Sequence, residues 1–192
     1  FAMRKNVKKQ LALRVLSTAA LMAMVSSIAT AAFADTYDLN TGSVTVETKD
    51  DGYTYVTQTD TKTGDFAQNS KGDTLDGTYK DTDPNGVTIT SNGKQTSNTI
   101  TVETAKDQTT NVTLDKVDIE VDTAKTKSGA IEIKGDGNTN LELNGDNTVL
   151  VKNHWFKDEH AAIEKADKYG NGTLTIKDDV NDDGKLLAGG YK

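Results

Sequence analysis

Apolar and polar positions alternate along most of the chain between residues 86 and 178. Short stretches place Leu or a β-branched residue at every second position, which is typical of half-buried strands. Asx-Gly pairs separate the stretches and favour tight turns. The stretches are GVTIT (86–90), NTITVET (98–104), NVTLDKVDIEV (111–121), GAIEIK (129–134), NLELNG (140–145), NTVLVK (147–152) and TLTIKD (173–178). This pattern predicts an all-β protein.

Two of these strands recur along the chain in the same order. Val112-Thr113-Leu114 aligns with Leu141-Glu142-Leu143 and with Leu174-Thr175-Ile176, at spacings of 29 and 33 residues. Ala130-Ile131-Glu132 recurs 32 residues later as Ala162-Ile163-Glu164. Such repeats predict a parallel β-solenoid whose rungs align residues 112, 141 and 174 in an inward ladder. The alternative is a β-sandwich, because its hairpins use the same Asx-Gly turns.

The repeats also divide the chain. Residues 35–105 are predicted to form an N-terminal cap and the first strands, since 57–86 is polar and nearly free of apolar alternation. Residues 106–192 are predicted to form the rungs, with the last rung incomplete. An incomplete rung leaves an unpaired edge, so we expect this edge to be prone to self-association.

Residues 1–34 have the features of a secretory signal peptide. Basic residues precede an apolar stretch, and Ala32-Phe33-Ala34 is a small-x-small cleavage site. The alternative is an uncleaved membrane anchor, which the Arg, Ser and Thr residues inside the apolar stretch disfavour. We therefore expect a secreted or cell-surface protein, with no membrane partner after cleavage.

Removal of this segment makes the chain strongly acidic. It leaves 17 basic against 29 acidic residues, a net charge of −12, and no Arg. Nucleic acid is therefore excluded as an expected partner, because its recognition relies on Arg and Lys. The chain has no Cys, so its stability comes from packing and backbone pairing.

One segment is a candidate binding patch. NHWFKDEH (153–160) interrupts a predicted rung and contains the only Trp of the chain. Trp155, Phe156 and His154 form the candidate ligand site, because exposed aromatic faces stack against sugar rings. The alternatives are that the aromatic side chains fold over the core, or that 155–168 is a short helix.

A second candidate is a calcium loop in DDVNDDGKL (178–186). Asp179, Asn181 and Asp183 are spaced as side-chain ligands, and Gly184 would form the sharp turn. The twelfth position is Gly190, where such a loop needs a bidentate acid. We therefore interpret the stretch as an acidic turn, with weak calcium binding at most and no other cofactor.

Several segments resemble the repeat region of large secreted surface proteins of Firmicutes. They include YDLNTGSVTV, LELNGDNTVLV and HAAIEKADKYGNGTLTI. The resemblance implies a right-handed β-helix with a carbohydrate-binding or adhesin-like role, and glycans or host and cell-surface components as partners.

We therefore expect a non-catalytic module for adhesion or glycan binding, or a structural spacer. The alternative is a polysaccharide lyase or glycoside hydrolase-like enzyme on a β-helix, which needs paired carboxylates. The aligned strands stack Thr113, Glu142 and Thr175 in one outward column and Asp115, Asn144 and Lys177 in the next, and neither column supplies such a pair.

Overall fold

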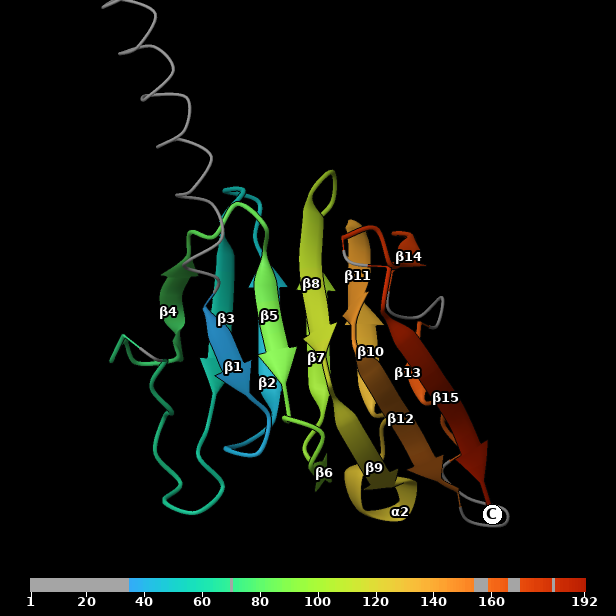
Figure 1. Ribbon diagram of the computed structural model, residues 1–192. Helices are drawn as coiled ribbons and strands as arrows, with labels where there is room; N and C mark the ends of the chain where they lie inside the picture. Colours follow the sequence, from blue (N-terminus) through green and yellow to red (C-terminus); the bar gives the residue numbers. More distant parts are fainter. Residues whose placement is uncertain (1–34, 70, 154–158, 166–169, 181) are drawn as a thin grey trace, which may run out of the picture. The chain divides into compact units, whose positions relative to one another are not determined.

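The computed structural model describes residues 35–69, 71–153, 159–165, 170–180 and 182–192 (Figure 1). The predicted signal peptide lies outside these residues. The described chain consists of strands, turns and one four-residue helix, α2 (Thr123–Thr126). None of its helices is long and apolar enough to span a membrane. The prediction of an all-β protein is confirmed.

The strands form three sheets. The five-stranded sheet contains, in order, β1 (Thr36–Asp38), β5 (Val87–Thr90), β8 (Thr109–Asp115), β11 (Asn138–Asn144) and β14 (Leu174–Lys177). The six-stranded sheet contains β13 (Ile163–Glu164), β10 (Ile131–Lys134), β7 (Ile100–Thr104), β2 (Val44–Thr48), β3 (Thr54–Gln58) and β4 (Asp76–Asp81). The four-stranded sheet contains β15 (Lys185–Tyr191), β12 (Asp146–Lys152), β9 (Asp118–Asp122) and β6 (Gln95–Thr96).

The chain visits these sheets repeatedly in one order. Each of the triplets β5–β6–β7, β8–β9–β10 and β11–β12–β13 places one strand in the five-stranded, four-stranded and six-stranded sheet in turn, and β14–β15 continue the order. Equivalent strands of successive triplets pair in parallel, as Figure 1 shows for β5, β8 and β11. Antiparallel pairing between the described strands is found in β2–β3–β4, whereas a sandwich would need it throughout.

The predicted register is confirmed for one pair of repeats and wrong for the next. Val112 pairs with Leu141, and Ile131 pairs with Ile163, as predicted. Leu174, however, pairs with Thr139, and it is Ile176 that pairs with Leu141. The inward ladder is therefore Val112, Leu141 and Ile176.

Hydrogen bonds between two turns explain this shift. The backbone N–H of Asn171 donates to Asp136 Oδ1 (2.9 Å), and the Thr173 hydroxyl donates to Asn138 Oδ1 (2.7 Å). A Cβ on Gly172 would lie 1.6 Å from the carbonyl oxygen of Gly137. The two Asx-Gly turns thus stack directly and set a spacing of 35 residues, which also moves the outward columns: Glu142 stands beside Lys177, and Thr175 beside Asn140.

The inward side chains of the three sheets form one apolar core. The largest fully buried apolar residues in the described strands include Ile89, Leu114, Ile119, Ile133 and Leu141. Alternate positions of each strand supply them, as the sequence pattern predicts.

Threonine hydroxyls line the corner where β7 leads into β8. Thr48 Oγ1 is 2.9 Å from Thr54 Oγ1 and accepts a hydrogen bond from Thr110 Oγ1 (2.7 Å). Thr104 Oγ1 lies 2.7 Å from the Thr110 hydroxyl and 3.2 Å from that of Thr139. This chain of hydroxyls satisfies buried polar groups at the corner.

The segment between β3 and β4 covers the strands at one edge of the sheets. It contributes Leu75 (0 % exposed) and Ala67 to the core. The predicted division at residue 105 stays a prediction. The parallel sheets continue across this residue, because β5 pairs with β8 and β7 pairs with β10.

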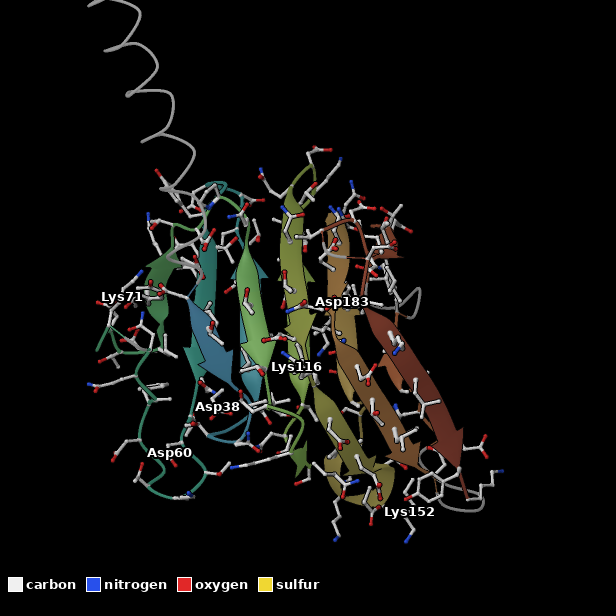
Figure 2. All side chains as sticks on the ribbon, in the orientation of Figure 1. Asp38, Asp60, Lys71, Lys116, Lys152 and Asp183 are labelled. Carbon is white, nitrogen blue, oxygen red and sulfur yellow. The ribbon has the colours of Figure 1, made fainter. Side chains whose placement is uncertain are left out.

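A buried polar cluster lies beside this segment. Asp81 accepts a hydrogen bond from the Tyr37 hydroxyl (2.9 Å), and Asp35 accepts one from the Tyr79 hydroxyl. Lys71, labelled in Figure 2, forms an ion pair with Asp35 (2.9 Å). Burial raises the pKa of Asp81, and hydrogen bonds from the Asp83 N–H and from Tyr37 oppose this only in part.

Candidate functional site

The predicted aromatic patch lies outside the described residues, because these omit 154–158 and with them Trp155, Phe156 and His154. The residues that flank it are held together. The Asn153 side chain accepts a hydrogen bond from the His160 N–H (3.0 Å) and donates one to the His160 carbonyl (3.2 Å). The patch stays a prediction.

The predicted calcium ligands are used in other ways where the structure describes them. Asp179 Oδ2 accepts from Lys177 Nζ (2.8 Å), and Asp183 Oδ1 accepts from the Gly145 N–H (3.4 Å). Asn181 lies outside the described residues. Figure 2 labels Asp183 in the turn that joins β14 to β15.

Glu142 anchors this acidic turn from the neighbouring strand. Its Oε1 accepts hydrogen bonds from the backbone N–H groups of Asp179 (2.6 Å) and Val180 (3.0 Å). Its Oε2 faces Lys177 Nζ at 3.5 Å, an ion-pair distance without hydrogen-bond geometry. Within the described ranges, no three His, Cys, Asp or Glu side chains are arranged to hold a metal ion. Weak calcium binding stays a prediction.

The outer face of the six-stranded sheet carries two rows of polar side chains. The charged row contains Lys80 on β4, Tyr55 on β3, Glu47 on β2, Glu103 on β7 and Lys134 on β10, which are register partners on adjacent strands. The threonine row contains Thr57, Thr45 and Thr101, and continues into Glu132 and Glu164. Register partners point to the same face, so each row is a line of side chains across the strands.

A pair of tyrosines marks one end of the charged row. Tyr53 is 48 % exposed, and Lys80 Nζ lies 3.9 Å from the centre of its ring. Lys49 Nζ lies 4.3 Å from the centre of the Tyr55 ring. The Tyr55 hydroxyl donates to Asp51 Oδ2 (2.6 Å). Lysines and a hydrogen bond therefore hold both rings in place at the protein surface.

These contacts shift two pKa values. The hydrogen bond from Tyr55 lowers the pKa of Asp51, and hydrogen bonding with Tyr55 raises the pKa of Lys80. The side chains of Asp51 and Lys80 are therefore both charged at neutral pH, and they contact the two tyrosines.

A groove runs beside the tyrosines, where β2, β7 and β10 end. It has a volume of about 400 Å³, and both carboxylates and lysines line it. Its charged lining residues are Glu47, Lys49, Asp50, Glu103, Lys106 and Asp136. Glu47 is also the cross-strand neighbour of Tyr55, so one side of the groove adjoins the tyrosines.

A second hollow lies on the same face. It has a volume of about 310 Å³ and is lined by Thr45 and Thr57 of the threonine row, together with Ser43, Gln58, Thr59 and Thr61. Five of these six side chains carry a hydroxyl group, which can both donate and accept hydrogen bonds.

The structure also places two acidic residues on neighbouring strands that the aligned columns did not reveal. Glu132 and Glu164 are register partners on β10 and β13. Glu132 Oε2 forms an ion pair with Lys134 (2.8 Å), and Glu164 Oε2 lies 2.7 Å from His160 Nδ1. The signal was present in the repeat of Ala-Ile-Glu, whose last residue is the acid.

Sequence reasoning missed the tyrosine pair. Tyr53 and Tyr55 follow Asp51-Gly52, a turn signal, and their spacing by two residues places them on one face of a strand. The alternation could have identified that common face. It could not have identified the contact with Lys80, because Lys80 lies on another strand.

No family model, curated protein or solved structure matches the chain.

Proposed function

We propose that this chain is a secreted bacterial surface module that binds glycans through the outer face of its six-stranded sheet. The observation that carries the proposal is the exposed Tyr53 with its neighbour Tyr55, beside a groove lined by charged side chains. Sugars are bound by aromatic faces that stack on their apolar side, and by polar groups that hydrogen-bond their hydroxyls. This face offers both.

We further propose that the strand triplets are the rungs of a right-handed parallel β-solenoid. The repeated visit to three sheets in one order and the parallel pairing of equivalent strands support it. A solenoid of this kind presents long, flat outer faces, which suit both binding and a spacer role. Export by the segment 1–34 would place the module outside the cell.

A glycan array with the purified protein tests the function. Tyr53→Ala should lower binding at least tenfold, because it removes the stacking surface. Tyr191→Ala is the matched control: Tyr191 is 43 % exposed and lies on β15, in another sheet, so its loss should leave binding unchanged. Absence of binding by the wild-type protein to every glycan would favour the spacer.

One observation favours a second candidate, hydrolysis of a glycosidic bond. Retaining glycosidases use two neighbouring carboxyl groups, one as the nucleophile and one as the acid and base. Glu132 and Glu164 occupy adjacent strands in register. Release of reducing ends from a polysaccharide panel, lost in Glu164→Gln and kept in a variant of an exposed acid in another sheet, Asp146→Asn, would establish this candidate. The binding proposal expects no release.

A further inference from the structure

The charged row runs across the strands and not along them. Its five residues are register partners on five adjacent strands, from β4 to β10. With adjacent strands roughly 4.8 Å apart, the row extends over about 19 Å. The face therefore presents one polar or aromatic group per strand, at a constant spacing.

This spacing selects for the shape of a ligand. In an extended, linear glycan, one sugar unit advances the chain by nearly the distance between two neighbouring strands. A chain laid across the strands would meet an equivalent position at each sugar. A branched or strongly coiled glycan has no such repeat and would match the face at one point only.

The chemistry changes along the row in a way that fits such a chain. Tyr53, which precedes β3 and is 48 % exposed, supplies a stacking surface for one sugar. Glu47 and Glu103 on the next two strands can accept hydrogen bonds from sugar hydroxyls, and Lys106 and Lys134 can donate them. The end with the tyrosines and the end with the groove would thus hold different sugars of one chain.

The charges of the groove exclude one class of polymer. Four carboxylates and two lysines line it, on a chain whose net charge is −7. A strongly anionic polysaccharide such as polygalacturonate would be repelled by this lining. An uncharged chain would not.

We infer that the charged row binds a linear, uncharged polysaccharide laid across β3, β2 and β7, with successive sugars on successive strands. This inference rests on the proposed glycan-binding function and adds the class of ligand and its direction on the sheet. The binding energy is then spread over several strands, so affinity depends on the length of the ligand.

The test is calorimetric titration with uncharged linear oligosaccharides of two to six units: cello-, xylo- and N-acetylglucosamine oligomers. In the series that binds, affinity should rise at least tenfold from the dimer to the pentamer and then level off. Tyr53→Ala should weaken binding of every length. Glu103→Gln should weaken the pentamer at least threefold and leave the dimer unchanged, because the dimer occupies the tyrosine end.

Asp146→Asn is the matched control for Glu103→Gln, because Asp146 is an exposed acid on β12, in another sheet. It should leave all affinities unchanged. Equal affinity for dimer and hexamer, or tighter binding of polygalacturonate, would overturn the inference while glycan binding itself stands. Absence of binding to every glycan, both in the titrations and on the array, would overturn the inference together with the proposed function.

Discussion

The two edges of the sheets differ in how far their apolar side chains are buried. At the edge formed by β1, β4 and β6, Tyr37 and Leu75 are buried. At the edge formed by β13, β14 and β15, Ile176 is 42 % exposed although it continues the inward ladder from Leu141 (0 %). Alternation therefore decides which face a side chain points to, and the neighbouring segment decides whether it is buried.

A polar segment produces the difference. The residues between β3 and β4 lie over the first edge and place Leu75 and Ala67 in the core. They also enclose Asp35 and Asp81 with two tyrosine partners, at a cost in desolvation. Covering an edge thus buries apolar area and carboxylates together.

Truncation of one apolar residue at each edge should give the largest contrast. Leu75→Ala should lower the free energy of unfolding by about 3 kcal/mol, because it empties a fully buried site. Ile176→Ala should cost less than about 1 kcal/mol, because the side chain is already in contact with water. Urea unfolding of both variants measures the contrast, and equal costs would show that the two edges do not differ.

Asp81→Asn should raise the free energy of unfolding at neutral pH. The gain should be smaller than the loss caused by Leu75→Ala. Burial raises the pKa of Asp81, so the folded state binds the proton more tightly than the unfolded state does. The wild type therefore gains stability relative to Asp81→Asn as the pH falls through the raised pKa towards the ordinary aspartate range. Chemical unfolding of both proteins between pH 4 and pH 8 follows the difference, which would stay constant if burial did not perturb Asp81.

The exposed edge should promote weak self-association. Unpaired strands are templates for another chain, and an inward-pointing charge at an edge blocks such pairing. Ile176→Lys should therefore shift the protein towards monomer in size-exclusion chromatography with light scattering. Val180→Lys adds the same charge in the β14–β15 turn, where the side chain is 72 % exposed, and should have no such effect. A wild-type protein that is monomeric at high concentration would contradict this prediction.

Calcium should produce the smallest effect. Asp179 is paired with Lys177, and Asp183 accepts a backbone hydrogen bond, so a cation would compete with these contacts. Thermal melts in excess calcium and in chelator should nearly coincide. A large stabilisation by calcium that Asp183→Ala removes would restore the interpretation of 178–186 as a calcium loop.

Part of the candidate site could have been derived from the sequence. The repeat of Ala-Ile-Glu places Glu132 beside Glu164, and the spacing of Tyr53 and Tyr55 places both on one face. The contacts of Lys80 with these rings could not be derived, because β4 reaches β3 through a polar segment whose path has no periodic signal. The groove likewise depends on which turns stack, and the hydroxyl chain from Thr54 to Thr139 depends on the angle at which sheets meet.

The sequence by itself determined that the protein is all-β, which residues of each strand face the core, and that strands about 30 residues apart pair, because alternation and repetition are local properties of the chain. The tertiary structure decided the register of β14 and the burial of each edge. Alternation has a period of two, so it accepts Leu174 or Ile176 equally well opposite Leu141. Only the hydrogen bonds between the stacked Asp136 and Asn171 turns distinguish the two.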